Sequence, residues 1–241
     1  GVVPVSTNRT ETLRMQPLVA WRAVKKLINN PEDTAQVFII IRALSGPSLE
    51  QGLRRFIELP FGRRVIEEKL DLLATLSDRD ALRLMPEGSL ADAYLHFVES
   101  ENLSADGLVE ASETAPEGYD NPWLQRYGLR LRDMHDLWHT TTQYGRDELG
   151  ELCLLAFTYA QTGNRGIGFI VMVGMLKLRK KFGNGVFQAA LRGYRDGRRA
   201  AWLPGQNWEA LLQQPLDQVR AQLVIDSPVT YQQVRAQAVT A

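Results

Sequence analysis

A spacing of two histidines and two carboxylates near the middle of the chain restricts the path that its backbone can take. His135 and His139 are four residues apart, so on a helix they share one face, and Asp136 lies at the edge of that face. Glu151 follows His139 by twelve residues, which is about 18 Å along a straight helix. Glu151 can therefore join the histidines only if the chain folds back, and Gly145 is the expected point of reversal.

These side chains have the chemistry of a site for a divalent cation. Zinc binds imidazole nitrogens and carboxylate oxygens, usually with tetrahedral geometry, at about 2.0–2.2 Å. The spacing therefore favours a divalent metal as cofactor, with Zn2+ as the first expectation. The alternative is a set of ordinary polar groups on an exposed helix, because a histidine pair at this spacing also occurs by chance.

The same stretch and four others resemble a known family. His135-Asp136-x-x-His139, followed by eleven residues and Glu151, is similar to the metal signature of the coenzyme Q (ubiquinone) biosynthesis protein 4 family. The matches run from about residue 15 to residue 226 and include Met85-Pro86-Glu87-Gly88-Ser89-Leu90 with Tyr94-Leu95, Gln125-Arg126-Tyr127, Gln161-Thr162-Gly163 and Trp208-Glu209-x-x-Leu212.

This resemblance implies a function and a ligand set. Members of the family replace the carboxyl group of a polyprenylated 4-hydroxybenzoate-type ring by hydroxyl, and they associate with other ubiquinone biosynthesis enzymes. The resemblance also implies a metal on His135, Asp136, His139 and Glu151. If Asp136 or Glu151 swings away from that metal, it becomes the candidate catalytic acid or base.

Two other functions fit the same residues. In the first, the metal is structural and the protein is a non-catalytic scaffold that binds prenyl lipid and organises the ubiquinone biosynthetic complex. In the second, the His-Asp pair belongs to a metal-dependent phosphohydrolase, which needs a further histidine upstream. His96 is the only upstream histidine in the sequence, and its place beside Phe97 favours a packed residue.

Composition indicates a folded chain without a nucleic-acid partner. Hydrophobic residues make up 44%, and 28 Lys and Arg balance 28 Asp and Glu, which argues against disorder and against a basic surface for nucleic acid. The arginine cluster of Arg192, Arg195, Arg198 and Arg199 is interpreted as a solvated face. The single Cys153 excludes an internal disulfide and is interpreted as a core residue.

Helical periodicity and helix-end signals predict an all-α fold. We expect a flexible N-terminal arm over 1–14 and a single helical domain over 15–241, a bundle of about eight to ten helices. Residues 102–120 are expected to form a loop or lid. Helices are predicted over 17–28, 31–44, 48–59, 64–76, 89–97, 122–144, 147–161, 166–181, 186–202, 208–213 and 216–224, with a short one after Pro228.

One predicted helix is apolar on every side. It runs through 166–176 and ends in Lys177, Arg179, Lys180 and Lys181. We interpret it as a central helix buried on all faces that also lines a tunnel for the isoprenoid tail, leading from the membrane surface towards the metal. The candidate lipid-binding residues are Phe169, Val173 and Leu176.

The apolar run is too short to cross a bilayer, because a spanning helix needs about 20 residues. We therefore expect peripheral attachment, to the cytoplasmic side of the inner membrane in a bacterium or to the matrix side of the mitochondrial inner membrane in a eukaryote. The N-terminus shows neither an apolar signal core nor an arginine-rich leader, which indicates a bacterial member or a chain without its leader. A homodimer is a further candidate partner.

Overall fold

The computed structural model describes residues 47–100 and 120–240, together with a few isolated residues between Leu18 and Ser45. Within this part of the chain every regular element is a helix, and the one strand-like pairing is an isolated bridge between Ser89 and Pro215. The all-α prediction is confirmed. The predicted arm over 1–14 and the loop or lid over 102–120 lie outside the described residues, as do most of the helices predicted before Ser45.

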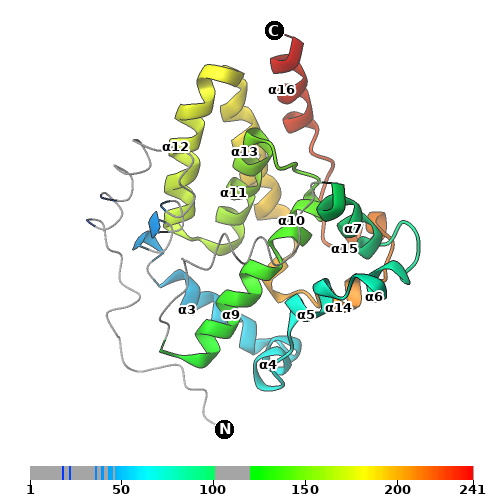
Figure 1. Cartoon of the computed structure of the whole chain (residues 1–241). Coiled ribbons are helices and arrows are strands. Elements are labelled where there is room, and N and C mark those ends of the chain that lie inside the picture. The colour runs from blue at the N-terminus through cyan, green and yellow to red at the C-terminus, as the bar shows by residue number, and fades with distance from the viewer. Residues whose placement is uncertain are drawn as a thin grey trace.

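The described elements follow one another along the chain as short and medium helices (Figure 1). They are α3 (Ser48–Glu58), α4 (Pro60–Glu67), α5 (Leu72–Ser77), α6 (Arg79–Arg83), α7 (Leu90–Ser100), α9 (Pro122–Asp133), α10 (His135–Thr142), α11 (Glu148–Thr162), α12 (Arg165–Phe182), α13 (Gly185–Arg199), the 3-10 turn η2 (Leu203–Gly205), α14 (Trp208–Leu211), α15 (Leu216–Gln222) and α16 (Val229–Thr240).

The longest of the described helices, α11, α12 and α13, pack together at one end of the molecule (Figure 1). Two glycines let α13 approach α11 closely. A Cβ added to Gly193 would lie 2.7 Å from the Cys153 carbonyl oxygen, and one added to Gly197 would lie 2.5 Å from the Phe157 carbonyl oxygen. Cys153 is fully buried in this contact, as predicted.

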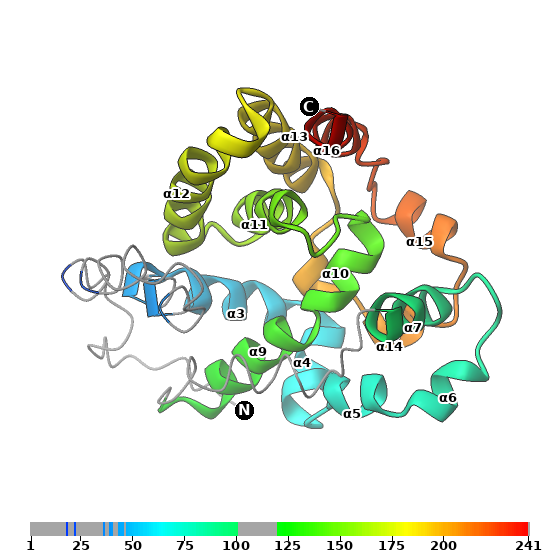
Figure 2. The ribbon, with the colours of Figure 1, turned by 45° about the horizontal axis from the view of Figure 1, so that its top comes forward.

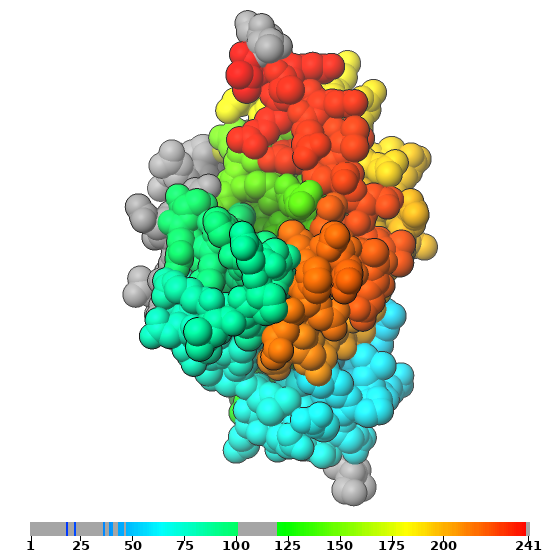
Figure 3. Space-filling view, turned by 90° about the vertical axis from the view of Figure 1, so that its right-hand side faces the viewer, coloured from blue at the N-terminus to red at the C-terminus, as the bar shows by residue number. Residues whose placement is uncertain are grey.

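A second group, formed by α3, α4 and α9, has its own small core, in which the rings of Phe56 and Tyr127 lie 5.2 Å apart. A third group joins α7 to the segment between α14 and α15, although the two are far apart in the sequence. The backbone N–H groups of Leu90 and Ala91, at the start of α7, donate to the carbonyls of Gln214 and Leu212. Figure 3 shows the two segments side by side on one face.

Helix α10 lies where the three groups meet (Figure 2). It contacts α9, α7, α15 and α11, and all of its residues from Asp136 to Thr142 are buried. The fold therefore holds the histidine helix at the centre of the molecule, and α16 packs against α11, α12 and α13 beside it.

Two predicted helices are divided in the structure. The helix predicted over 64–76 is interrupted after α4, where Lys69 has a left-handed φ of 54° and Asp71 caps α5. The helix predicted over 122–144 has a turn at Met134, with φ −85° and ψ 0°, which separates α9 from α10. The described residues accordingly form more and shorter helices than the periodicity predicted.

The interpretation of 166–176 as a helix buried on all faces is wrong. Helix α12 forms, but Met172 is 61% and Leu176 is 65% exposed. Helix α12 packs against α11, α13 and α16, and its Phe169 and Ile170 lie in a small cluster with Ile40. Met172 and Leu176 lie outside these contacts.

Candidate metal centre

The chain reverses between α10 and α11, as the spacing predicted. Helix α10 ends at Thr142 and is followed by Gln143 with a left-handed φ of 64°, and Asp147 caps the start of α11 by accepting a hydrogen bond from the Gly150 N–H at 3.1 Å. The reversal thus includes Gly145, as expected, and its left-handed residue is Gln143.

Gly145 contributes to the reversal because it has no side chain and so allows close packing. A Cβ at this position would lie 2.6 Å from Asp147 Oδ1 and 2.9 Å from the Tyr231 hydroxyl oxygen. The Gly145 N–H donates to that hydroxyl at 3.3 Å, and the Tyr231 hydroxyl donates in turn to Asp147. Tyr231, on α16, thus binds the middle of the loop at Gly145 and its end at Asp147.

The reversal brings His135, His139 and Glu151 together. One candidate ligand atom from each residue can be chosen so that all three lie within 4.8 Å of one another. Glu151 Oε1 lies 3.2 Å from His139 Nε2, and Glu151 Oε2 lies 3.9 Å from His135 Nε2. Two imidazoles and one carboxylate converge here on one small volume.

A second contact orients the His139 ring. His139 is 1% exposed, and its Nδ1 lies 2.8 Å from the Tyr144 carbonyl oxygen. A carbonyl can only accept, so Nδ1 donates to it, and Nε2 is the ring nitrogen that faces Glu151. Metal-bound histidines are held in the same way by a hydrogen bond on the other nitrogen. The residues therefore fit a divalent cation, and two histidines with one carboxylate suit zinc or iron(II).

Glu151 has the charge state of a ligand. Burial is the largest influence and acts to raise the pKa of its carboxyl group. Hydrogen bonds and charges from His135 and His139 together outweigh burial and lower that pKa to about 2. Glu151 is therefore an anion at neutral pH, and its side chain is 40% exposed.

Asp136, the fourth predicted ligand, makes a different contact. It is 3% exposed, and its Oδ1 accepts a hydrogen bond from Arg146 Nη2 at 2.7 Å. It is not a member of the group that converges around Glu151. Burial raises the pKa of the Asp136 carboxyl group, and the Arg146 charge opposes that rise.

Two residues near the centre were not predicted from the sequence. The Arg146 guanidinium lies 4.7 Å from the ring centre of Phe97, and the Phe97 ring stacks on the His139 ring at 5.3 Å and 25°. Nothing in the local spacing pairs Phe97 on α7 with His139, so only the tertiary fold shows the contact.

His96 does not take part in the centre. Its side chain is 82% exposed, and its Nδ1 lies 2.9 Å from the Asp92 carbonyl oxygen on its own helix. The interpretation of His96 as a packed residue is therefore wrong. The upstream histidine that a phosphohydrolase would need does not reach the described centre either.

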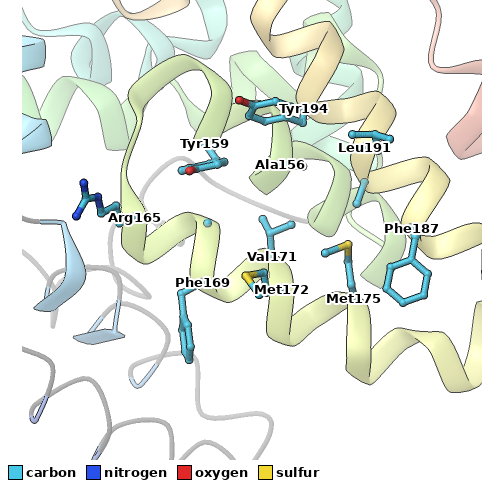
Figure 4. A pocket seen from close by; sticks show the side chains of 12 residues that line it. Ala156, Tyr159, Arg165, Phe169, Val171, Met172, Met175, Phe187, Leu191 and Tyr194 are labelled. Atoms are coloured by element: carbon cyan, nitrogen blue, oxygen red, sulfur yellow. The ribbon is translucent and has the colours of Figure 1, made fainter.

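An apolar pocket of about 450 Å³ lies between α11, α12 and α13 (Figure 4). Of the predicted lipid-binding residues, Phe169 lines this pocket, whereas Val173 and Leu176 do not. No residue of the metal group lines it. The remaining lining residues are Ala156, Tyr159, Arg165, Gly168, Val171, Met172, Met175, Phe187, Ala190, Leu191 and Tyr194.

Comparison with known proteins identifies the family. The family model described as "Coenzyme Q (ubiquinone) biosynthesis protein Coq4" matches residues 6–229. The chain belongs to the Coq4 family. A curated relative from Yarrowia lipolytica, "Ubiquinone biosynthesis protein COQ4, mitochondrial", is 28% identical over 177 residues, which cover 73% of the chain and 66% of the relative. A COQ4 homolog from Anopheles gambiae is 26% identical over 226 residues, 91% of the chain and 77% of that relative.

The chain spans only part of several Coq4 relatives, 58% of those from Scheffersomyces stipitis and Candida tropicalis. A crystal structure of a candidate ubiquinone biosynthesis protein from Nostoc punctiforme has a TM-score of 0.64 and 20% identity. That comparison covers 88% of this chain and all of the Nostoc chain, and it shows that the two share a fold. Among the described helices, none combines the length and the apolar character that crossing a membrane requires.

Proposed function

We propose that this chain acts in ubiquinone biosynthesis as a metal-dependent enzyme that replaces the carboxyl group of a polyprenylated 4-hydroxybenzoate-type ring by hydroxyl. The observation that supports the proposal most strongly is the convergence of His135, His139 and Glu151, in a chain of the Coq4 family. The replacement is a net oxidation, so it also needs an external oxidant such as dioxygen.

The residues around the centre suit this reaction. His135, His139 and Glu151 would hold a divalent metal, zinc or iron(II), whereas Asp136, the fourth ligand that the family resemblance implies, pairs with Arg146. When bound, the cation supplies positive charge that binds the carboxylate or phenolate and stabilises the anion formed as CO2 leaves. His135 and Glu151 have side chains that are 33% and 40% exposed, so a ring can approach the centre from one side.

Glu151 and Asp136 are the candidate catalytic acid and base in the proposal. Either carboxylate can accept a proton from the ring phenol and return it to an oxygen of the hydroxylated product. Burial raises the pKa of the Asp136 carboxyl group, whereas the pKa of Glu151 is lowered to about 2.

The prenyl tail needs an apolar environment, because each buried CH2 contributes about 0.8 kcal/mol. The pocket between α11, α12 and α13 supplies one, with Phe169 in its lining. We place Val173 and Leu176 along the path from the pocket to the outer surface of α12, where Leu176 is exposed. This surface, with its basic end at 177–181, is the proposed contact with the membrane.

We also propose where the chain attaches to the membrane and which proteins it binds. Peripheral attachment on the cytoplasmic side of a bacterial inner membrane, or on the matrix side in mitochondria, would bring the pocket to its lipid substrate. Other enzymes of ubiquinone biosynthesis, and a second copy of the chain, are the proposed protein partners.

The test is turnover by the purified, metal-loaded chain in detergent or vesicles. A short-chain prenylated 4-hydroxybenzoate, supplied with dioxygen, should give a product that has exchanged its carboxyl group for hydroxyl, as read by mass spectrometry. His139→Ala should abolish this product and His96→Ala should not. Lipid binding that persists without product under every metal and oxidant tried would favour the scaffold.

A further inference from the structure

Asp136 stands apart from the three residues that converge on the metal centre. Its Oδ1 is 2.7 Å from Arg146 Nη2, and the whole residue is 3% exposed. The metal group contains His135, His139 and Glu151 without it. A buried carboxylate that is paired with a guanidinium already has its charge compensated, and breaking such a pair is costly.

Arg146 is held from a second direction as well. Its guanidinium lies over the Phe97 ring at 4.7 Å, and Phe97 in turn stacks on the His139 imidazole. The guanidinium is therefore fixed next to the metal centre, with its face on Phe97 and one edge on Asp136.

The guanidinium is not saturated by these contacts. Arg146 Nε is buried and has no hydrogen-bond partner, and the side chain is 17% exposed. An unmade hydrogen bond on a buried donor is unfavourable, and a ligand that supplies an acceptor removes that cost. The planar fork of arginine matches a carboxylate in particular.

We propose that Asp136 positions Arg146 and does not bind the metal. Arg146 then receives the carboxylate of the ring substrate, beside a metal held by His135, His139 and Glu151. This inference rests on the proposed function, because it names the residue that recognises the group to be removed. Three protein ligands also leave a coordination position open, whereas four would close a tetrahedral site.

The first experiment uses Co2+ as the probe, since its visible absorption depends on the atoms that ligate it. We expect Asp136→Asn, in the full chain, to bind Co2+ with the stoichiometry and spectrum of the parent protein. Glu151→Gln, the matched control, should change the spectrum, and His139→Ala should lose the ion. A spectrum of Asp136→Asn altered as much as that of Glu151→Gln would overturn the assignment of Asp136.

The second experiment measures ligand binding to the Zn2+-loaded chain by calorimetry. We expect 4-hydroxybenzoate to bind at least tenfold more tightly than phenol, which lacks the carboxylate. Asp136→Asn and Arg146→Lys should remove most of that preference and leave phenol binding within a factor of about three. Arg146→Lys keeps the charge but loses the fork, and circular dichroism checks that both variants fold.

The outcomes separate this inference from the proposed function. No preference for 4-hydroxybenzoate in the parent protein, or a preference that survives both substitutions, would overturn the role of Arg146. Full Co2+ binding by His139→Ala would instead reject the metal centre on which the proposed function depends.

Discussion

The ion pair between Arg130 on α9 and Glu209 on α14 supplies a test of how the chain is held together. Arg130 Nη1 and Nη2 donate to the two carboxylate oxygens of Glu209 at 3.2 and 2.6 Å. The Arg130 side chain is 3% exposed, the Glu209 side chain is 24% exposed, and the guanidinium lies 5.3 Å from the Phe61 ring centre. Replacing Glu209 by Gln removes the negative charge and leaves the buried guanidinium uncompensated.

We expect Glu209→Gln to lower the free energy of unfolding by about 3 kcal/mol, the lower end of the range for breaking a buried pair. Water that reaches the partly exposed Glu209 keeps the loss from being larger. This loss is a large share of the free energy of unfolding of a typical domain, which is about 5–15 kcal/mol. Urea unfolding followed by circular dichroism measures the change from the midpoint and slope.

Two controls make the result specific. Glu67→Gln breaks the exposed pair with Arg63, whose side chains are 43% and 52% exposed, and should cost less than about 0.5 kcal/mol. Arg130→Met with Glu209→Gln should cost less than the sum of the single changes, because no buried charge remains. A loss for Glu209→Gln no larger than that for Glu67→Gln would refute the reasoning.

The remaining predictions concern the metal, the core and the reversal loop. The chain should bind about one divalent cation by elemental analysis, and His139→Ala should remove the ion without unfolding the chain, whereas His96→Ala should keep it. Burial raises the pKa of Cys153 from 9.0 to about 12. The stability that the neutral thiol contributes should therefore be complete below about pH 9 and fall as the pH rises towards 12. Urea unfolding at alkaline pH should show a larger loss of stability in the parent protein than in Cys153→Ala. Gly193→Ala should cost about 1–3 kcal/mol by overpacking against α11; an unchanged urea midpoint would contradict the close approach. Tyr231→Phe removes the hydroxyl that binds the reversal loop, so we expect weaker Zn2+ binding by calorimetry with helix content retained, and unchanged affinity would argue against that role.

Local signals were sufficient for the helices whose ends are set by their own residues. Gly163 adopts a left-handed φ of 65° and ends α11 as predicted, and Asn164 caps α12 with its side chain. Ser89 Oγ accepts from the Asp92 N–H near the start of α7, and the Asp92 carboxylate accepts from the Gly88 N–H. Helix α3 begins at Ser48 directly after Pro47.

The parts that could not be predicted depend on contacts between distant segments. The turn at Met134 does not follow from any proline or glycine, and Met134 is fully buried where the helix groups meet. An apolar sequence predicts that a helix is buried, but it does not show which neighbouring elements cover each of its faces. The exposed residues of α12 could therefore not be predicted. The family resemblance implied that His135, His139 and Glu151 meet, which their spacing allows only if the chain reverses, while the pairing of Asp136 with Arg146 needed the folded loop.

The hydroxyl of Tyr231 sets an order of events during synthesis. It bonds to Asp147, 84 residues earlier, and to the Gly145 N–H, 86 residues earlier. At about 5–20 residues per second on a ribosome, that separation corresponds to a delay of about 4–17 s. The nascent chain therefore carries both histidines and the glutamate for several seconds before the tyrosine that clamps their loop has been made. During that interval the loop between α10 and α11 lacks its hydrogen bonds to Tyr231, so these contacts beside the candidate metal centre form late.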